Sequence, residues 1–134
     1  MIVIKNKIIP FGSYDIINLF GILFTKSDID KIEYNHENIH TEQIKDCLVI
    51  GILLFVILKL MFDISGLWLL ATPATFYLLY SLEYVCIRLF HKKQGDAYHD
   101  VSFEEEAYNN EGDLEYNKHR EPFNWIKYIK LKSN

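Results

Sequence analysis

The sequence predicts an α+β protein of mainly helical structure, because three kinds of segment follow one another. The N-terminal part is rich in β-branched and aromatic residues and predicts a short β-hairpin or sheet. A His-Glu-Asn-Ile-His motif at residues 36–40 predicts a helix that leads into an apolar stretch over residues 47–90. A polar, carboxylate-rich segment then predicts a C-terminal helix. With 134 residues, the chain is expected to form one domain, residues 1–134, with 47–90 as an insertion.

The balance of charged residues argues against a nucleic-acid partner. The chain has 18 Asp and Glu residues and 14 Lys and Arg residues, for a net charge of -4. Acidic residues gather between Asp96 and Glu121, and no basic stretch with interleaved aromatic residues occurs in the sequence. Binding to nucleic-acid phosphates depends on such basic stretches. We therefore expect no nucleic acid among the partners.

Residues 1–26 predict β structure before the first helix. Isoleucines near the start alternate imperfectly with lysines, a Pro-Phe-Gly-Ser turn signal follows, and Ile16–Phe24 is a short apolar run. The pattern predicts two strands joined at Gly12. The helix after them has two alternative starts, Ser27–Asp30 and Asn35, because Ser, Asp and Asn all favour the N-cap position.

The apolar stretch over residues 47–90 predicts a hairpin in a membrane. Its arms, Cys47–Phe62 and Leu67–Phe90, would be about 24 Å and about 36 Å long as helices, with a kink at Pro73. A bilayer core needs about 20 apolar residues, so the first arm is short. The alternative is a buried hairpin of a soluble protein. We favour the membrane, because a domain of this size could hardly cover two helices that are apolar on every side.

The positions of Lys and Arg predict how this hairpin is oriented. The loop between the arms, Asp63–Gly66, contains neither residue, whereas both flanking polar parts contain several. The positive-inside rule then places both polar parts on the cytoplasmic side. We expect membrane lipid as a partner, the inner (cytoplasmic) membrane as the location, and a site that faces the cytoplasm.

The polar segment after the hairpin predicts one amphipathic helix. It would span Asp96–Arg120, with Phe103 and Ala107 on its apolar face and Gly112 as a weak point. Pro122 would end it, because proline interrupts helical hydrogen bonding.

The His-Glu-x-x-His motif has a chemical meaning on a helix. Residues four apart share a face, so the imidazoles of His36 and His40 can reach one metal ion, for which the pattern favours Zn²⁺. Glu37 is rotated toward the open position of such a metal, where its carboxylate can take a proton from water. The alternative is a pair of solvated histidines on a helix surface.

The third metal ligand is not determined by the motif. A catalytic zinc site takes three protein ligands and leaves one position open. Gln43 and Asp46 stand where the metzincin pattern has a glycine and a third histidine, which leaves a glutamate from a later helix. The residues that could supply a ligand are His91, His99, His119, Glu104, Glu105, Glu106 and Glu111.

Three segments carry a resemblance to a known family. Ile17–Gly21 reads Ile-Asn-Leu-Phe-Gly, Asn35–Gln43 reads Asn-His-Glu-Asn-Ile-His-Thr-Glu-Gln, and Ser102–Tyr108 reads Ser-Phe-Glu-Glu-Glu-Ala-Tyr. In this order they resemble small bacterial membrane-associated zinc metallopeptidase-like proteins of the gluzincin clan, which are related to minigluzincins. The resemblance covers most of the chain.

The resemblance implies a minigluzincin-like domain with His36, His40 and Glu104 as zinc ligands and Glu37 as the catalytic base. The implied activity is zinc-dependent hydrolysis of a peptide or protein substrate near the membrane. One alternative is a catalytically silent zinc-binding membrane protein that acts as a sensor or scaffold. Another is a membrane accessory protein without a metal.

The residues that would stabilise an oxyanion remain open. Tyr108 stands where the larger proteases of the clan have an aspartate that orients a ligating histidine. A hydrogen-bond donor near the metal is needed for oxyanion stabilisation, and Tyr108, Tyr116, His119 and Arg120 are candidates. We single out Tyr108 and His119.

Overall fold

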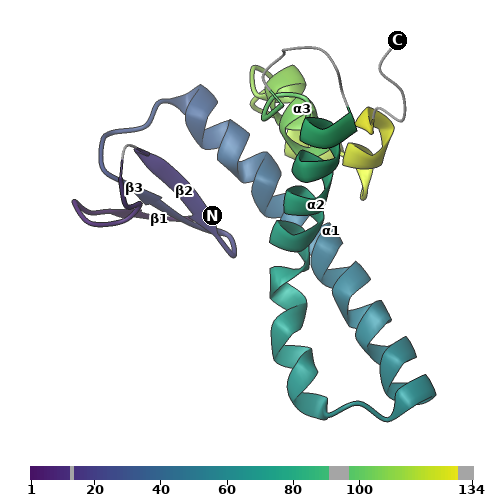
Figure 1. The fold of residues 1–134 in the computed structure, drawn as a ribbon. Coiled ribbons are helices and arrows are strands. Elements are labelled where there is room, and N and C mark those ends of the chain that lie inside the picture. The colour runs from purple at the N-terminus through teal and green to yellow at the C-terminus, as the bar shows by residue number, and fades with distance from the viewer. Residues whose placement is uncertain (13, 91–96, 130–134) are drawn as a thin grey trace.

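The computed structural model describes residues 1–12, 14–90 and 97–129, and it shows a mainly helical protein with a small sheet beside one long helix (Figure 1). The predicted class, α+β and mainly α, is confirmed at this level. In chain order the elements are β1 (Ile2–Lys5), β2 (Ile16–Leu19), β3 (Ile22–Thr25), α1 (Lys31–Phe62), the 3-10 helix η1 (Gly66–Ala74), α2 (Thr75–Phe90), α3 (Ser102–Asn110), α4 (Tyr116–His119) and the 3-10 helix η2 (Asn124–Tyr128).

The sheet has three strands in the order β1-β3-β2, and the predicted hairpin at Gly12 is wrong. β1 pairs parallel with β3, and β2 pairs antiparallel with β3. The tight turn lies at Phe20 and Gly21, whose φ angles are 53° and 82°. Positive φ at both central residues is what a two-residue hairpin turn of type I′ requires. The apolar run that suggested a single strand therefore folds back on itself.

α1 begins at the earlier of the two predicted starts. The Asp30 side chain accepts hydrogen bonds from the first turn, and the Glu33 side chain accepts one from the Asp30 backbone N–H, which together form a capping box. Asn35, the alternative start, has another role. Its amide donates to the carbonyl oxygens of Glu111 and Asp113, 2.8 and 2.9 Å away, and so links α1 to the segment after α3.

The far half of α1 forms the apolar hairpin (residues 47–90) with η1 and α2, and this arm projects away from the rest of the molecule (Figure 1). The two sides approach closely at Gly51. A Cβ atom there would overlap the Thr75 hydroxyl oxygen and lie 2.9 Å from the Thr72 carbonyl oxygen. Glycine at this position therefore permits the close packing of α1 on η1.

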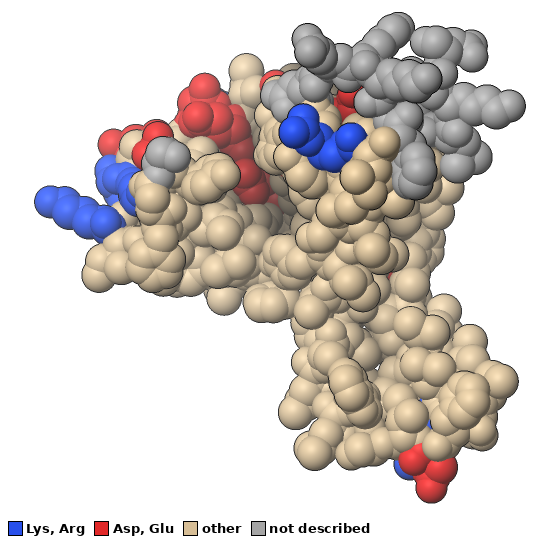
Figure 2. Space-filling model, viewed as in Figure 1, with Lys and Arg blue, Asp and Glu red and all other residues tan. Residues whose placement is uncertain are grey.

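The outer surface of the apolar hairpin consists of exposed aliphatic and aromatic side chains. Leu60 is 82% exposed and Leu70 is 80% exposed. Figure 2 shows almost no charge on the visible face of this arm except at its tip. Among the described residues, one segment, Gly66–Leu89, is long and apolar enough to cross a membrane, by length and composition alone.

The single helix predicted over Asp96–Arg120 is also wrong, since α3 and α4 are separate. Asp96 itself lies outside the described residues. α3 starts at Ser102, and the Asn35 amide binds carbonyl oxygens at its other end, from Glu111 and Asp113. Those carbonyl groups would have to accept intrahelical hydrogen bonds if the helix continued. The hydrogen bonds from Asn35 of α1, which is distant in sequence, are therefore made where α3 ends.

Aromatic packing holds α3 against the other helices. The ring of Phe103 stacks on Trp125 of η2, with centroids 4.4 Å apart, and meets the edge of Phe76 of α2 at 5.0 Å. Phe103 is almost fully buried, and Ile44 and Cys47 of α1 belong to the same hydrophobic cluster. The residue that follows Phe103 in α3 is thereby directed toward α1.

Candidate metal centre

The structure brings His36 and His40 of α1 together with Glu104 of α3. The two Nε2 atoms lie 3.1 Å apart, and Glu104 Oε2 is 3.3 Å from the first and 3.6 Å from the second. Zinc bonds of about 2.0–2.1 Å at a tetrahedral angle would separate two ligand atoms by about 3.3 Å. The three atoms thus have the spacing of ligands to one ion, and the group could hold a metal.

The electrostatics of this group favour a positive charge. Glu104 is 3% exposed, and a buried carboxylate is costly unless a positive charge or several donors compensate it. One proton on an imidazole can bridge only two of the three atoms (the two Nε2 atoms and Glu104 Oε2), whereas a divalent ion can bond to all three. Two imidazoles and a carboxylate are also a ligand set of catalytic zinc sites. The residues present therefore fit a metal.

The outer nitrogen of each imidazole has its own partner. His36 Nδ1 lies 2.8 Å from Glu111 Oε2, and His40 Nδ1 lies 2.7 Å from Gln43 Oε1. Both partner oxygens accept hydrogen bonds, so each Nδ1 donates and each Nε2 can direct its lone pair into the cluster. The sequence suggests Glu111 only as a possible ligand and indicates no role for Gln43. The position of Gln43, three residues after His40 on the same helix face, could have indicated this contact.

A buried ionic network lies behind Gln43. The Gln43 amide donates to Glu106 Oε2 at 2.9 Å, and the Tyr116 hydroxyl donates to Glu106 Oε1 at 2.9 Å. Arg120 donates to Glu106 at 2.8 Å and to Asp46 at 2.9 Å. Burial raises the pKa of Glu106, but hydrogen bonds from Arg120 and Gln43 outweigh this and hold it below its usual value. Glu106, Tyr116 and Arg120 are therefore engaged with one another.

Glu37 is half-buried and, with His36, lines a pocket of about 360 Å³. The other lining residues are Ile16, Ile32, Glu33, Tyr98, Tyr108 and Glu111. Burial raises the pKa of the Glu37 carboxyl, and the nearby histidines oppose this effect. Figure 2 shows acidic side chains gathered in the hollow between the sheet and the helices. The predicted base is thus open to a pocket beside the candidate metal ligands.

The two predicted oxyanion donors lie in different places. The Tyr108 ring packs against His36, with centroids 4.6 Å apart, and Tyr108 lines the pocket. His119 is 62% exposed, its Nε2 atom lies 3.4 Å from Asp113 Oδ2, and it does not line that pocket. Of the two, Tyr108 is the one beside the cluster.

The remaining ligand candidates do not join the cluster within the described residues. His99 packs its ring against Tyr108, with centroids 4.5 Å apart. Glu105, like His99, is outside the group of three, and Glu111 meets the outer nitrogen of His36. His91 lies outside the described residues.

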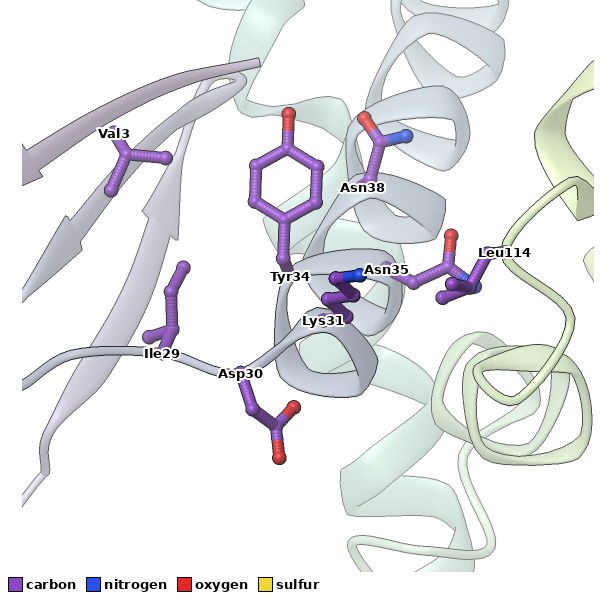
Figure 3. Close-up of a pocket in the computed structure, with 8 residues that line it drawn as sticks. All are labelled: Val3, Ile29, Asp30, Lys31, Tyr34, Asn35, Asn38 and Leu114. Atoms are coloured by element: carbon purple, nitrogen blue, oxygen red, sulfur yellow. The ribbon is translucent and has the colours of Figure 1, made fainter.

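A second pocket, of about 430 Å³, adjoins a different face of α1 (Figure 3). Lys31, Tyr34 and Asn38 of α1 line it together with Val3 of β1 and Leu114. None of the three cluster residues lines this pocket. This pocket is therefore separate from the candidate metal centre.

Comparison of the chain with family models, curated proteins and solved structures found no significant match.

The stability of the metal-free protein should depend on pH through the buried His40–Glu104 pair. Burial lowers the pKa of His40, but the hydrogen bond and charge of Glu104 outweigh this and raise it from 6.5 to about 9. Burial raises the pKa of Glu104, but hydrogen bonds with both histidines hold it below 4.5. Stabilisation by protonated His40 is complete below pH 6.5 and is lost as the pH rises through about 9. Stabilisation by ionised Glu104 is present above pH 4.5 and is lost as the pH falls.

Thermal unfolding in EDTA should therefore show its highest midpoint between pH 4.5 and 6.5 and a fall toward pH 9. A His40→Gln variant, which cannot be protonated in this range, should lack the alkaline fall. An equal alkaline fall in the wild type and in this variant would contradict the assignment.

Proposed function

We propose that this protein is a zinc-dependent metallopeptidase that hydrolyses peptide bonds close to a membrane. The observation that carries the proposal is the triangle of His36 Nε2, His40 Nε2 and Glu104 Oε2, whose sides are 3.1–3.6 Å. Glu37 lies beside it at a pocket large enough for part of a peptide. A set of possible metal ligands, a possible base and a pocket that a substrate could enter thus occur together, as hydrolysis at a metal requires.

The residues of the site would divide the reaction among them. His36, His40 and Glu104 would hold the metal, and zinc, when bound, supplies the Lewis acidity that makes a water proton removable near neutral pH. Glu37 would take that proton and pass it to the leaving amine nitrogen. In the metal-free protein, burial raises the pKa of Glu37, which is the direction that favours a general base. Tyr108, next to His36, would donate to the oxygen of the scissile carbonyl.

The sheet offers a way to align a peptide substrate. β2 is an edge strand, and Ile16 at its start lines the pocket that contains Glu37. An extended peptide can pair with the free edge of a strand by backbone hydrogen bonds, independently of its side chains. This arrangement supports a peptide or protein as substrate.

The exposed surface of the apolar hairpin supports membrane lipid as its surroundings. Soluble proteins rarely expose apolar patches of more than a few hundred Å², and this arm exposes large apolar side chains along α1, η1 and α2. The orientation follows from the absence of Lys and Arg in Asp63–Gly66. The proposed location is the cytoplasmic membrane, with the site on the cytoplasmic side.

A second candidate function is a zinc-binding membrane protein without catalytic activity, acting as a sensor or scaffold. One observation favours it. The hydroxyl of Tyr80, on the apolar hairpin, donates to Glu104 Oε1 at 3.0 Å. A sensor would need such a direct link between a membrane segment and a metal ligand.

The first prediction of the proposal is metal content. The purified full chain should retain about one zinc ion, because three protein ligands and one open position complete a single tetrahedral site. His36→Ala and His40→Ala should each abolish retention, whereas His119→Ala, at an exposed position, should keep it. Elemental analysis of the dialysed proteins provides the measurement. Undiminished zinc in both α1 variants would refute the proposed centre.

A second prediction separates metal binding from chemistry. Glu37→Gln keeps the size of the side chain but removes the base, so zinc should stay while cleavage of a mixture of quenched fluorescent peptides falls by about 10²–10⁴-fold. If the wild type holds zinc but cleaves none of the peptides, the silent zinc-binding protein is favoured. Equal cleavage by the wild type and the Glu37→Gln variant would show that Glu37 is not the base.

A third prediction concerns the membrane. The full chain should stay with the membrane fraction in carbonate at high pH, and a cysteine introduced by Ser65→Cys should react with an impermeant reagent only from the non-cytoplasmic side. Lys118→Cys, in the polar part and with a side chain that is 75% exposed, is the matched variant for the opposite side. Release by carbonate without detergent would instead favour the soluble hairpin.

A further inference from the structure

The second arm of the apolar hairpin contacts the candidate metal centre through side chains spaced three residues apart. Tyr77, Tyr80 and Glu83 of α2 follow this spacing, so they lie along one side of the helix. Tyr80 and Glu83 contact α3, which carries Glu104, whereas Tyr77 contacts the sheet.

The Tyr77 hydroxyl contacts the sheet and not the candidate ligands. It accepts a hydrogen bond from the Phe20 N–H at 2.8 Å and donates to the Asn18 carbonyl oxygen at 3.1 Å. The Asn18 side chain in turn donates to the backbone carbonyl oxygen of Glu37 at 2.8 Å. The described partners of the Tyr77 hydroxyl are therefore backbone atoms, and none of them belongs to a proposed metal ligand.

Glu83 holds the start of the helix that carries Glu104. Its two carboxylate oxygens accept hydrogen bonds from the Ser102 N–H at 3.0 Å and from the Ser102 hydroxyl at 2.7 Å. A carboxylate at a helix N-terminus satisfies a free N–H group and interacts favourably with the helix dipole. α3 is thus joined to α2 two residues before the proposed ligand.

Tyr80 acts on the ligand itself. Its hydroxyl donates to Glu104 Oε1, whereas Glu104 Oε2 faces the two imidazoles. The two oxygens of one carboxylate thus have separate partners, and this division restrains rotation of the carboxylate about its last bond. Tyr98 also hydrogen-bonds Glu104, but it belongs to the turn before α3 and not to the hairpin.

We propose that Tyr80 is a positioning residue through which the apolar hairpin orients Glu104 and thereby sets the metal affinity of the site. The inference rests on the proposed function, since it takes Glu104 as a metal ligand. Hydrogen-bonding partners of metal ligands typically change metal affinity by about 10–100-fold. The position of α2 relative to α3 then regulates the metal affinity of the centre. A shift of α2 along or away from α3 would break the hydrogen bond from Tyr80 to Glu104.

The test compares two Tyr→Phe variants that lie one turn apart on the same helix. Tyr80→Phe removes the hydrogen bond to the ligand, and Tyr77→Phe removes hydrogen bonds to backbone groups only. For the full chain in detergent, we expect zinc dissociation constants, measured by chelator competition, that are about 10–100-fold higher for Tyr80→Phe and unchanged for Tyr77→Phe. The visible absorption bands of bound Co²⁺ should shift in the first variant only, which a purely structural role would not cause.

The outcomes are distinguishable from failure of the proposed function. If the wild type binds neither zinc nor Co²⁺, the metal centre itself is refuted. If the wild type binds zinc and Tyr80→Phe matches Tyr77→Phe in affinity and spectrum, the positioning role is refuted while the centre stands. Should Tyr80→Phe not fold, Glu83→Gln, which weakens the hold of α2 on Ser102, must lower zinc affinity relative to Tyr77→Phe for the inference to survive.

Discussion

Two buried carboxylates on one short helix determine how the other elements are arranged around the site. Glu104 and Glu106 of α3 are 3% and 0% exposed, and each needs positive charge or donors to offset the loss of hydration. Two residues along a helix correspond to a rotation of about 200°, so the carboxylates face different sides. α3 must therefore lie where histidines meet one side and Arg120 meets the other.

Gln43 couples these two sides. Its Oε1 atom contacts His40 Nδ1 at 2.7 Å, and its amide nitrogen donates both to Glu106 and to the Phe103 carbonyl oxygen at 2.9 Å. One side chain of α1 thus orients a proposed ligand and holds the backbone of α3. Sites built on helices and supported by such hydrogen bonds keep their geometry better than sites on loops. The candidate centre is accordingly held in place by hydrogen bonds of the protein itself.

The parts of the site that the sequence could predict depend on the spacing of residues within one helix. The separation of four residues places His36 and His40 on one face of α1, and Asp30 caps that helix through its own first turn. The parts that the sequence could not predict depend on contacts between segments that are far apart in the chain. The hydrogen bond from Tyr80 to Glu104 has no counterpart in local pattern, and the separation of α3 from α4 involves Asn35, which lies far away in the sequence. The strand error arose because β-branched and aromatic composition does not reveal a turn at Phe20.

Glu111 contacts His36 from a position three residues beyond Tyr108. Tyr108 occupies the position at which larger proteases of the resembled clan have a carboxylate that orients a ligating histidine. Here Glu111, three residues further on, lies 2.8 Å from His36 Nδ1, and Tyr108 packs its ring on the same imidazole. A carboxylate on the outer nitrogen makes the inner one a better metal donor. His36 thus has a carboxylate partner on its outer nitrogen, as a histidine would need to serve as a ligand in the proposed centre.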